Sequence, residues 1–458
     1  MKIQPKVSLA WVFATALLLL ATSSATGQDA LEKYISQGLN DNLVIKQKNI
    51  SLDKAVSALD EAKSYFLPGV NFSGSYVTGH GGRDIPLPIG DLLNPVYTTL
   101  NGLTHSNQFP QVQNQTIYFF PTDFYDVHLH TTMPLVNTDL GYNKTIKNEQ
   151  IQLAGYEVET YKRSLVKDIK TAYYNYLMAI SAQKIYENAI TLLQKNVDVN
   201  KSLQNNGIGL QQKVLRAQGE LENVQAQLND SKNQADNARR YFNFLLNRKT
   251  DEAIDTAYNA NGALADVQSY LGARNVSARE ELKMAQTGRD IYENLYHMNK
   301  RFWVPKIGAF LDLGSQAEGI VVNSQSLYYL VGAQVDIPVF NWNRYNFKTK
   351  QAQADFQIAE LNSQYTSNGL ALSLSVAQNG LSTSYENFKT SQNAYNIAKS
   401  YFKMVDDGYR EGVNNQIEYL DARNQLTTSQ LMLTINMYKA LQAMAAVERE
   451  SATYVFKK

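Results

Sequence analysis

Residues 335–342 read VDIPVFNW, where an alternating run of apolar and polar residues meets a proline and opens into a long segment without proline. The pattern occurs twice. MPLVN (133–137) and IPVFN (337–341) share the order hydrophobic, Pro, hydrophobic, hydrophobic, Asn at an offset of 204 residues (337 minus 133). A second pair of strings, NNGIGLQQKVLRAQ from Asn205 and REGVNNQIEYLDAR from Arg410, repeats at an offset of 205 residues (410 minus 205). The chain is therefore predicted to contain two copies of one structural unit.

Composition excludes several classes of function. The 458 residues include 43 basic and 42 acidic side chains, so no excess of positive charge favours a nucleic acid partner. Cysteine is absent, which excludes disulfides, cysteine-ligated metal and thiol catalysis. No motif typical of nucleotide binding, serine hydrolysis, zinc proteolysis or calcium binding occurs, so neither an enzyme activity nor a cofactor is predicted.

The first 28 residues have the layout of a secretory signal peptide. Lys2 and Lys6 precede an apolar run from Leu9 to Ala21, and small residues follow. A membrane anchor is the alternative, although a spanning helix needs about 17 or more apolar residues.

Two long tracts without proline, residues 135–304 and 339–458, are rich in Ala, Leu, Gln, Asn, Lys and Glu and predict long helices. Each tract turns back at a glycine, Gly207 or Gly412. A 4-3-4-3 spacing on both arms of the first tract indicates an antiparallel coiled coil. Its outgoing seam is Leu165, Ile169, Ala172, Tyr176, Ala179, Gln183, Tyr186, Ile190, Leu193 and Val197, and its return seam is Val214, Ala217, Leu221, Val224, Leu228, Ser231, Ala235, Ala238, Phe242 and Leu245.

Alternating stretches before these tracts predict two strands in each copy. The apolar positions are Val70, Phe72, Tyr76, Tyr125, Val127, Leu129, Met133, Ile307, Ala309, Leu311, Leu313, Tyr329, Val331, Ala333, Val335 and Ile337. Strands of about ten residues suit a tilted membrane-spanning barrel. Since four strands cannot close a barrel and open edges are not tolerated in lipid, several subunits would have to share one barrel of eight, twelve or sixteen strands. A soluble two-layer sheet with its apolar face buried is the alternative.

The chain resembles the TolC family of outer-membrane efflux proteins in the order of its duplicated elements. Each copy has a helix, a hairpin that follows LP or VP, the string P-x-x-N, a long helix and a glycine turn. The strings YFLPGVNFSGSY and GYREGVNNQIEYLDARNQL carry the likeness, which covers nearly the whole chain after the signal. The resemblance implies a mainly α protein with a membrane β-barrel: an internally duplicated, trimeric α/β barrel with four strands per chain and long antiparallel coiled-coil hairpins. It also implies a bacterial outer-membrane location, a homotrimer, a periplasmic adaptor and an inner-membrane pump as partners.

On this resemblance the chain divides into eight segments. They are the signal peptide (1–28), an N-terminal periplasmic helix (29–66), a first β-hairpin with a long outer loop (67–134), a first helical hairpin turning near 205–212 (135–248), a periplasmic belt segment and helix (249–303), a second β-hairpin (304–338), a second helical hairpin turning near 408–416 (339–450) and a C-terminal tail (451–458).

The family resemblance also implies a periplasmic gate at the helical turns. Glu418 and Asp421 match its acidic ring and Tyr409 its network tyrosine, while an ordinary solvated helix face is the alternative for the two acids. Asn414 stands where the family often has an arginine, and Lys213 where the first copy often has an acid. A swapped latch, in which Lys213 meets Glu418 or Asp421 across neighbouring hairpins, is therefore a hypothesis. Adaptor contact is expected at the turns, at Gly207, Ile208, Gly209, Leu210, Gly412 and Val413.

Two rival interpretations stay open. The first is a secreted coiled-coil scaffold or adaptor without a pore, which would stay soluble without detergent. The second is an enzyme in the helical body, but no set of residues with catalytic spacing supports it. His128 and His130, two apart on the polar face of a strand, allow metal binding in a symmetric assembly, with simple lumen-facing polar residues as the alternative. No resident metal is predicted from the sequence.

Overall fold

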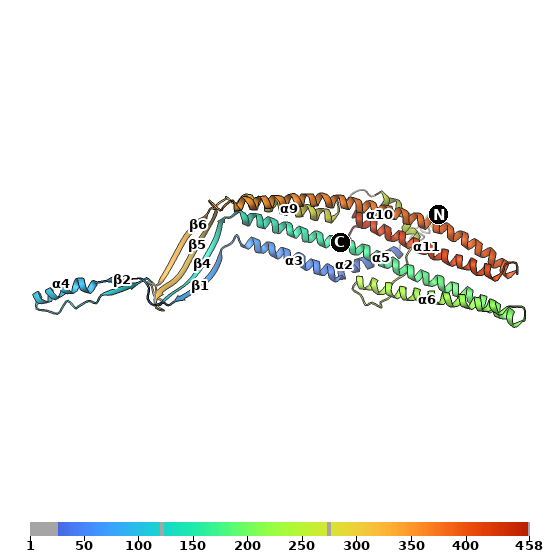
Figure 1. Cartoon of the computed structure of the whole chain (residues 1–458), viewed down its shortest axis with the longest axis horizontal. Coiled ribbons are helices and arrows are strands. Elements are labelled where there is room, and N and C mark those ends of the chain that lie inside the picture. The colour runs from blue at the N-terminus through green and yellow to red at the C-terminus, as the bar shows by residue number, and fades with distance from the viewer. Residues whose placement is uncertain (1–25, 120–122, 273–275, 457–458) are drawn as a thin grey trace, which may run out of the picture. The chain divides into compact units, whose positions relative to one another are not determined.

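The computed structural model describes residues 26–119, 123–272 and 276–456, so the predicted signal peptide lies almost wholly outside the described residues. In chain order the elements are α2 (Thr26–Asp41), α3 (Leu43–Ser64), β1 (Gly69–Val77), β2 (Asp84–Leu87), α4 (Ile89–Thr104), β3 (Gln115–Tyr118), β4 (Phe124–Val136), α5 (Thr138–Asn205), α6 (Gln211–Leu245), α7 (Ala260–Ala263), the 3-10 turn η1 (Leu264–Asp266), α8 (Val267–Leu271), α9 (Glu280–Lys300), β5 (Lys306–Glu318), β6 (Leu327–Asp336), α10 (Arg344–Arg410) and α11 (Gln416–Ser451) (Figure 1). The predicted mainly helical fold is confirmed.

The chain divides into two units, and the first is helical. It comprises residues up to 56, 149–292 and 355–458. Its core lies along the predicted seam, where Leu165, Ile169 and Leu193 of α5 are buried together with Val224 and Phe242 of α6. Each such side chain stabilises the fold by about 1.5–3 kcal/mol relative to its exposed state.

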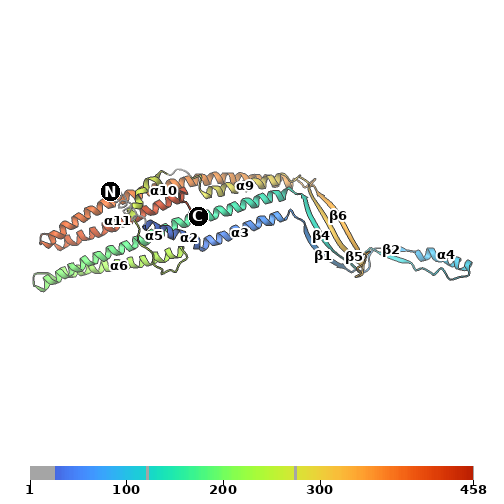
Figure 2. The ribbon, with the colours of Figure 1, turned by 180° about the vertical axis from the view of Figure 1, so that it is seen from behind.

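The second unit, residues 57–148 and 293–354, contains a four-stranded antiparallel sheet in the order β1-β4-β5-β6. The strands lie side by side in that order in front and rear views (Figures 1 and 2). The register places Phe72, Leu129, Leu313 and Tyr329 in one row on one face of the sheet. Phe72 is 73% exposed and Tyr329 is 76% exposed, so this apolar face is uncovered in the single chain.

The stretch VDIPVFNW is the junction between strand and helix. β6 ends at Asp336, and α10 begins at Arg344. Trp342 and Asn343, with φ of 51° and 60°, turn the chain in the left-handed region. In the first copy the matching Pro134 lies in β4, at a register shift against β5, which is where a strand tolerates proline.

Two elements differ from the predicted ones. The helix expected over 29–66 is divided at Asn42, whose Oδ1 accepts the N–H groups of Val44 and Ile45 at 2.9 and 3.3 Å and so caps α3. The Asn42 amide also donates to the Leu245 carbonyl at 3.0 Å, which ties the break to the end of α6. The expected outer loop contains its own elements, α4 and the two-stranded sheet of β2 and β3.

No helix in the described parts of the chain combines the length and the apolarity needed to cross a bilayer.

Candidate functional site

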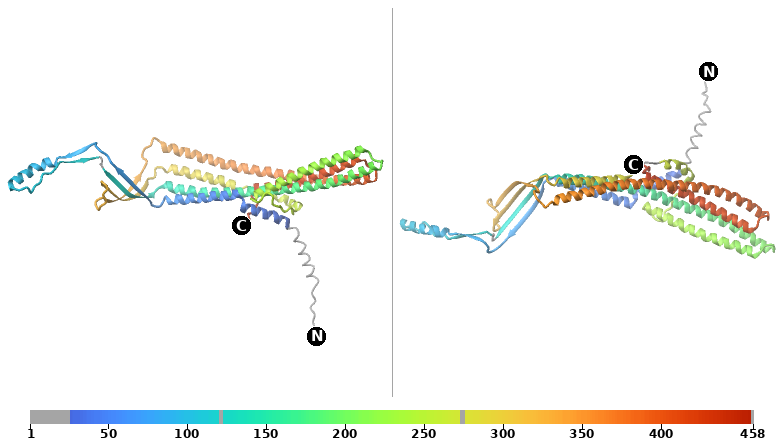
Figure 3. Two further views of the ribbon diagram at one scale, coloured as in Figure 1. Left: turned by 90° about the horizontal axis from the view of Figure 1, so that it is seen from below. Right: turned by 45° about the horizontal axis from the view of Figure 1, so that its top comes forward.

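The two helical turns share one backbone conformation. Gly207 and Gly412 have φ of 76° and 78°, the left-handed values that glycine adopts without strain. Ile208 N–H donates to the Leu203 carbonyl at 3.1 Å, and Val413 N–H donates to the Gly408 carbonyl at 2.8 Å. These bonds satisfy the last carbonyls of α5 and α10, so both hairpins turn in the same way. Both turns are visible at the free ends of the helical hairpins in Figure 3.

The residues expected to contact an adaptor are at the surface of these turns. Ile208, Leu210 and Val413 are large apolar side chains that are mostly exposed. Gly209 follows closely on the end of α5, because a Cβ there would lie 2.6 Å from the Gln204 nitrogen. The turns thus present apolar side chains on a compact backbone.

The start of α11 has a capping box that the start of α6 lacks. Asn415 Oδ1 accepts from the Ile417 and Glu418 N–H groups at 2.9 and 3.0 Å, and Glu418 Oε2 accepts from the Asn415 N–H at 3.0 Å. Glu418 Oε2 also accepts from the Asn414 amide at 2.9 Å. The Asn414 hydrogen bond, followed by that from the Asn415 backbone, lowers the pKa of Glu418. Glu418 is therefore ionised in a cap.

The other acidic residue of the predicted gate, Asp421, and the basic residue of the predicted latch, Lys213, are at the surface. Asp421 is exposed one turn after Glu418 on α11, and Lys213 is exposed at the start of α6. Within the described chain, the Lys213 ammonium makes no ion pair with either acid; its backbone carbonyl instead accepts from the Gln416 amide at 2.8 Å. The predicted latch is not formed between these groups inside one protomer.

Tyr409 belongs to a network of neutral groups, the turn network, which we define as Asn196, Asn200, Tyr409 and Gln416. The Tyr409 hydroxyl accepts from the Asn196 and Asn200 amides at 3.4 and 3.3 Å, and Gln416 donates to Asn196 Oδ1 at 3.4 Å. These long hydrogen bonds link α5 to α10 and α11. Tyr409 also stacks on Tyr419, with ring centroids 4.8 Å apart, and burial raises the pKa of Tyr419 to about 12.

An ion pair between the buried Arg423 and the partly exposed Glu220 joins α11 to α6. Arg423 is 1% exposed and donates from Nη2 to Glu220 Oε1 at 2.7 Å. Its Nε and Nη1 are buried and have no hydrogen-bond partner among the described residues, and burial lowers the pKa of Arg423. Sequence reasoning missed Arg423, Asn196 and Asn200. The spacing of the two asparagines, four residues apart beside the seam residue Val197, was an available signal.

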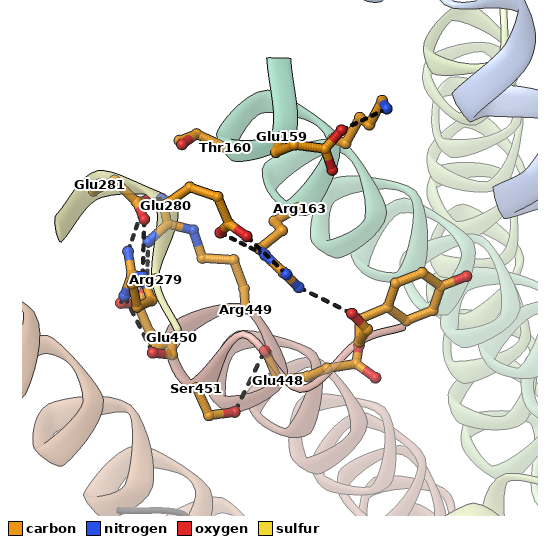
Figure 4. A network of polar contacts seen from close by, with 12 residues as sticks. Glu159, Thr160, Arg163, Arg279, Glu280, Glu281, Glu448, Arg449, Glu450 and Ser451 are labelled. Atoms are coloured by element: carbon orange, nitrogen blue, oxygen red, sulfur yellow. Dashed lines mark hydrogen bonds and ion pairs between the residues drawn. The ribbon is translucent and has the colours of Figure 1, made fainter. Parts of the chain in front are cut away.

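A second polar cluster, the clamp, lies at the other end of α11 (Figure 4). It consists of Arg163, Arg279, Glu280, Glu281, Arg449 and Glu450. Arg163 binds Glu280 through two bonds of 2.6 and 2.9 Å, and Arg279 binds Glu281 through two bonds of 2.7 and 3.0 Å. Burial favours a higher pKa for Glu281, but hydrogen bonds from Arg279 and from its own backbone outweigh burial and lower that pKa. The clamp joins α5, α9 and α11.

One group of side chains in the described chain has the composition of a metal site. It is His128, His130 and Asp312, on the sheet and not at the turns.

The sequence profile of the family described as outer membrane efflux protein matches residues 34–248 and 271–450. Toxin and drug export protein A of Aggregatibacter actinomycetemcomitans is 24% identical over 314 residues, 65% of this chain; the chain spans 66% of that relative's length, slightly under two thirds. Outer membrane protein TolC of Escherichia coli strain K12 is 20% identical over 445 residues, 93% of this chain and 82% of that protein.

A solved structure of CusC, a protein described as forming a transmembrane channel, superposes with a TM-score of 0.76. It is 13% identical, and the match covers 92% of both chains. At this identity the likeness shows the fold alone.

Proposed function

The chain belongs to the outer membrane efflux protein family, and from this membership we propose that it is the outer-membrane channel of a tripartite efflux or type I secretion system. In this function the channel is passive. Substrate crosses its lumen from a pump to the cell exterior, and the channel supplies neither energy nor chemistry. We assign it no catalytic role.

The observation that carries the proposal is the sheet with an uncovered apolar face and two outer edges. β1 and β6 stand at the ends of the order β1-β4-β5-β6, so each has one edge without a partner in that sheet. The exposed rings of Phe72 and Tyr329 suit contact with lipid tails. Since each unpaired backbone group costs several kcal/mol in lipid, the edges must pair with sheets of other protomers.

We propose that three protomers complete the barrel, as the resemblance to the TolC family implies. Three sheets of four strands give twelve strands in all. The helix α5 has 68 residues and α10 has 67, so each is about 100 Å long at 1.5 Å per residue. Helices of this length would carry a tunnel well into the periplasm.

The gate is proposed at the helical turns. Glu418 and Asp421 lie three residues apart on one face of α11, so three copies would form two stacked acidic rings that attract cations. The turn network of neutral groups holds α10 and α11 against α5 until the hairpins separate. Lys213 of a neighbouring hairpin completes the latch with one of these acids.

The adaptor is proposed to dock on the turns, at Gly207, Ile208, Gly209 and Leu210 and at Gly412 and Val413. The exposed Ile208, Leu210 and Val413 supply the apolar contact area. An adaptor that binds the separated hairpins more tightly than the closed ones shifts the equilibrium towards the open gate. The size of the shift is set by the difference between its two affinities.

Planar bilayer recording of the detergent-purified protein tests the proposal. We expect step-like currents, and Tyr409→Phe should increase the conducting fraction about twofold to fivefold because two amide donors lose their acceptor. Tyr365→Phe, on an exposed side chain of α10, is the matched control and should leave the currents unchanged. A homogeneous purified oligomer that never conducts would refute the channel.

Cross-linking tests the gate separately. Asp421→Cys should form disulfides between protomers under oxidation, and the cross-linked channel should lose transport that a reducing agent restores. Transport that continues after complete cross-linking would contradict the gate while leaving the channel intact. Lys213→Ala should raise the conductance, and an unchanged conductance would count against the latch.

A further inference from the structure

The polar face of the sheet brings together histidines of β4 and an aspartate of β5. The register pairs His130 with Asp312 and His128 with Gly314. The side chains of His128, His130 and Asp312 therefore share one face of the sheet. One ligand atom from each of His128, His130 and Asp312 lies within 4.8 Å of the others. The sequence alone places two histidines on a strand, whereas the third donor comes from a strand about 180 residues later and is set by the register.

The three side chains are shielded from solvent to different degrees. Asp312 is buried, and its Oδ1 contacts His130 Nδ1. The side chains of His128 and His130 are 23% and 38% accessible, which leaves an approach from solvent. A Cβ at position 314 would lie 2.5 Å from the Cβ of His128, so glycine there leaves the room that this imidazole occupies.

A further carboxylate orients His128. His128 Nδ1 lies 3.1 Å from Asp126 Oδ1, and the Tyr328 hydroxyl donates to the same oxygen at 3.0 Å. With Nδ1 held by Asp126, Nε2 of His128 is left as its ligand atom. Histidines that bind metals in proteins are commonly held in this way, through a carboxylate on the other ring nitrogen.

We propose that His128, His130 and Asp312 form a binding site for a divalent transition-metal cation of the zinc class, with Asp126 and Tyr328 as its supporting shell. Two imidazoles and one carboxylate give three protein ligands and leave a fourth position for water or an incoming ligand. Magnesium and calcium favour all-oxygen sites, so the two nitrogens select zinc, copper or nickel. The register already holds His130 Nδ1 beside Asp312 Oδ1, so little movement is needed for both to reach one cation.

The site is present in one protomer, so its test does not depend on the proposed channel. Zinc chloride is titrated calorimetrically into the full-length protein, purified in detergent through a tag without histidine. We expect saturable binding of about one zinc per chain. His130→Ala and Asp312→Asn should abolish saturable binding, and Asp126→Asn should weaken it about 10-fold to 100-fold.

Two controls separate this site from others in the chain. The triple variant His80→Ala, His105→Ala and His297→Ala removes the three histidines outside the cluster and should bind zinc as the unmodified protein does. Glu386→Gln, at an exposed acid of α10, should also retain binding. Asp312→Asn keeps the shape of the side chain, so it serves if His130→Ala does not fold.

The proposal fails if the unmodified protein shows no saturable zinc binding. It also fails if folded His130→Ala or Asp312→Asn protein binds zinc with unchanged affinity.

Discussion

The clamp and the turn network lie at opposite ends of α11 and differ in chemistry. Between Gln416 and Arg449 the helix rises roughly 50 Å at 1.5 Å per residue. The clamp pairs full charges through bidentate bonds of 2.6–3.0 Å, whereas the turn network pairs amides with a phenol at 3.3–3.4 Å. Charged bidentate bonds are roughly twice as strong as neutral ones. One end of α11 is therefore held by paired charges, and the other end carries a network of neutral hydrogen bonds.

Replacement of Arg279, the most buried arginine of the clamp, should have the largest effect on stability. Arg279→Met removes the buried cation beside Glu281 and Glu450, to which Arg449 still donates, so the cost should lie at the low end of the range for breaking a buried pair, about 3 kcal/mol of unfolding free energy. Thermal or denaturant unfolding measures the change. Arg240→Met removes an exposed pair with Asp236 and serves as the control, with no resolvable change expected. Equal effects of the two variants would show that the clamp does not fasten the bundle.

Acid should weaken the clamp in a defined direction. The folded-state pKa of Glu281 lies below its ordinary value of 4.5, so its contribution is fully present above pH 4.5 and is lost as pH falls through the folded pKa. Unfolding free energy measured from pH 6 downwards should decline less steeply in Glu281→Gln than in the unmodified protein. Parallel curves would mean that Glu281 carries no such contribution.

The ion pair between Glu220 and Arg423 should respond unequally to loss of either partner. Glu220→Gln keeps an acceptor oxygen but removes the negative charge that faces the buried guanidinium, and should cost about 1–3 kcal/mol. Arg423→Met replaces a poorly satisfied cation by an apolar side chain of similar size and should cost less, or even stabilise the protein. Chemical unfolding measures the unfolding free energy of both variants. A larger loss of stability in Arg423→Met than in Glu220→Gln would contradict this expectation.

The turn glycines should be equivalent. Gly207→Ala and Gly412→Ala each force alanine into the left-handed region at a cost of about 1 kcal/mol, since nothing lies within 4 Å of either new Cβ. Gly219→Ala, inside α6, should instead stabilise the protein by about 0.5–1 kcal/mol. Unfolding measurements that give the same sign for all three variants would refute the shared turn geometry.

The smallest expected effect concerns the cap that one turn lacks. Leu210 and Lys213 occupy the positions that Asn415 and Glu418 hold in the second turn, 205 residues later (415 minus 210). Leu210→Asn combined with Lys213→Glu should stabilise the start of α6 by about 0.5–1 kcal/mol. Amide hydrogen exchange at residues 211–216 should slow accordingly. Unchanged exchange would show that the turns are not limited by their caps.

The positions of the helical turns could be predicted because they depend on local chemistry. Glycine at each turn ends α5 at Asn205 and α10 at Arg410, and α6 and α11 begin at Gln211 and Gln416, all at the predicted offset of 205 residues. The family resemblance and the outer-membrane location are confirmed by the family match. The long helices and the four strands follow from periodicity and from proline positions.

The remainder depends on contacts between distant segments. Asn42 divides the first helix because its amide meets the end of α6, 203 residues away. The burial of Arg423 and the meeting of His130 with Asp312 depend on packing and register across the chain, which periodicity does not specify. The roles of Glu418, Asp421, Tyr409 and Lys213 at a gate stay predictions.

The central claim is that four strands per chain are too few, so protomers pool their sheets in the membrane. Native mass spectrometry of the detergent-extracted protein tests it most directly. We expect a particle of three chains that loses its oligomeric state when detergent is withdrawn. A folded, monodisperse single chain that is stable in buffer without detergent would contradict it.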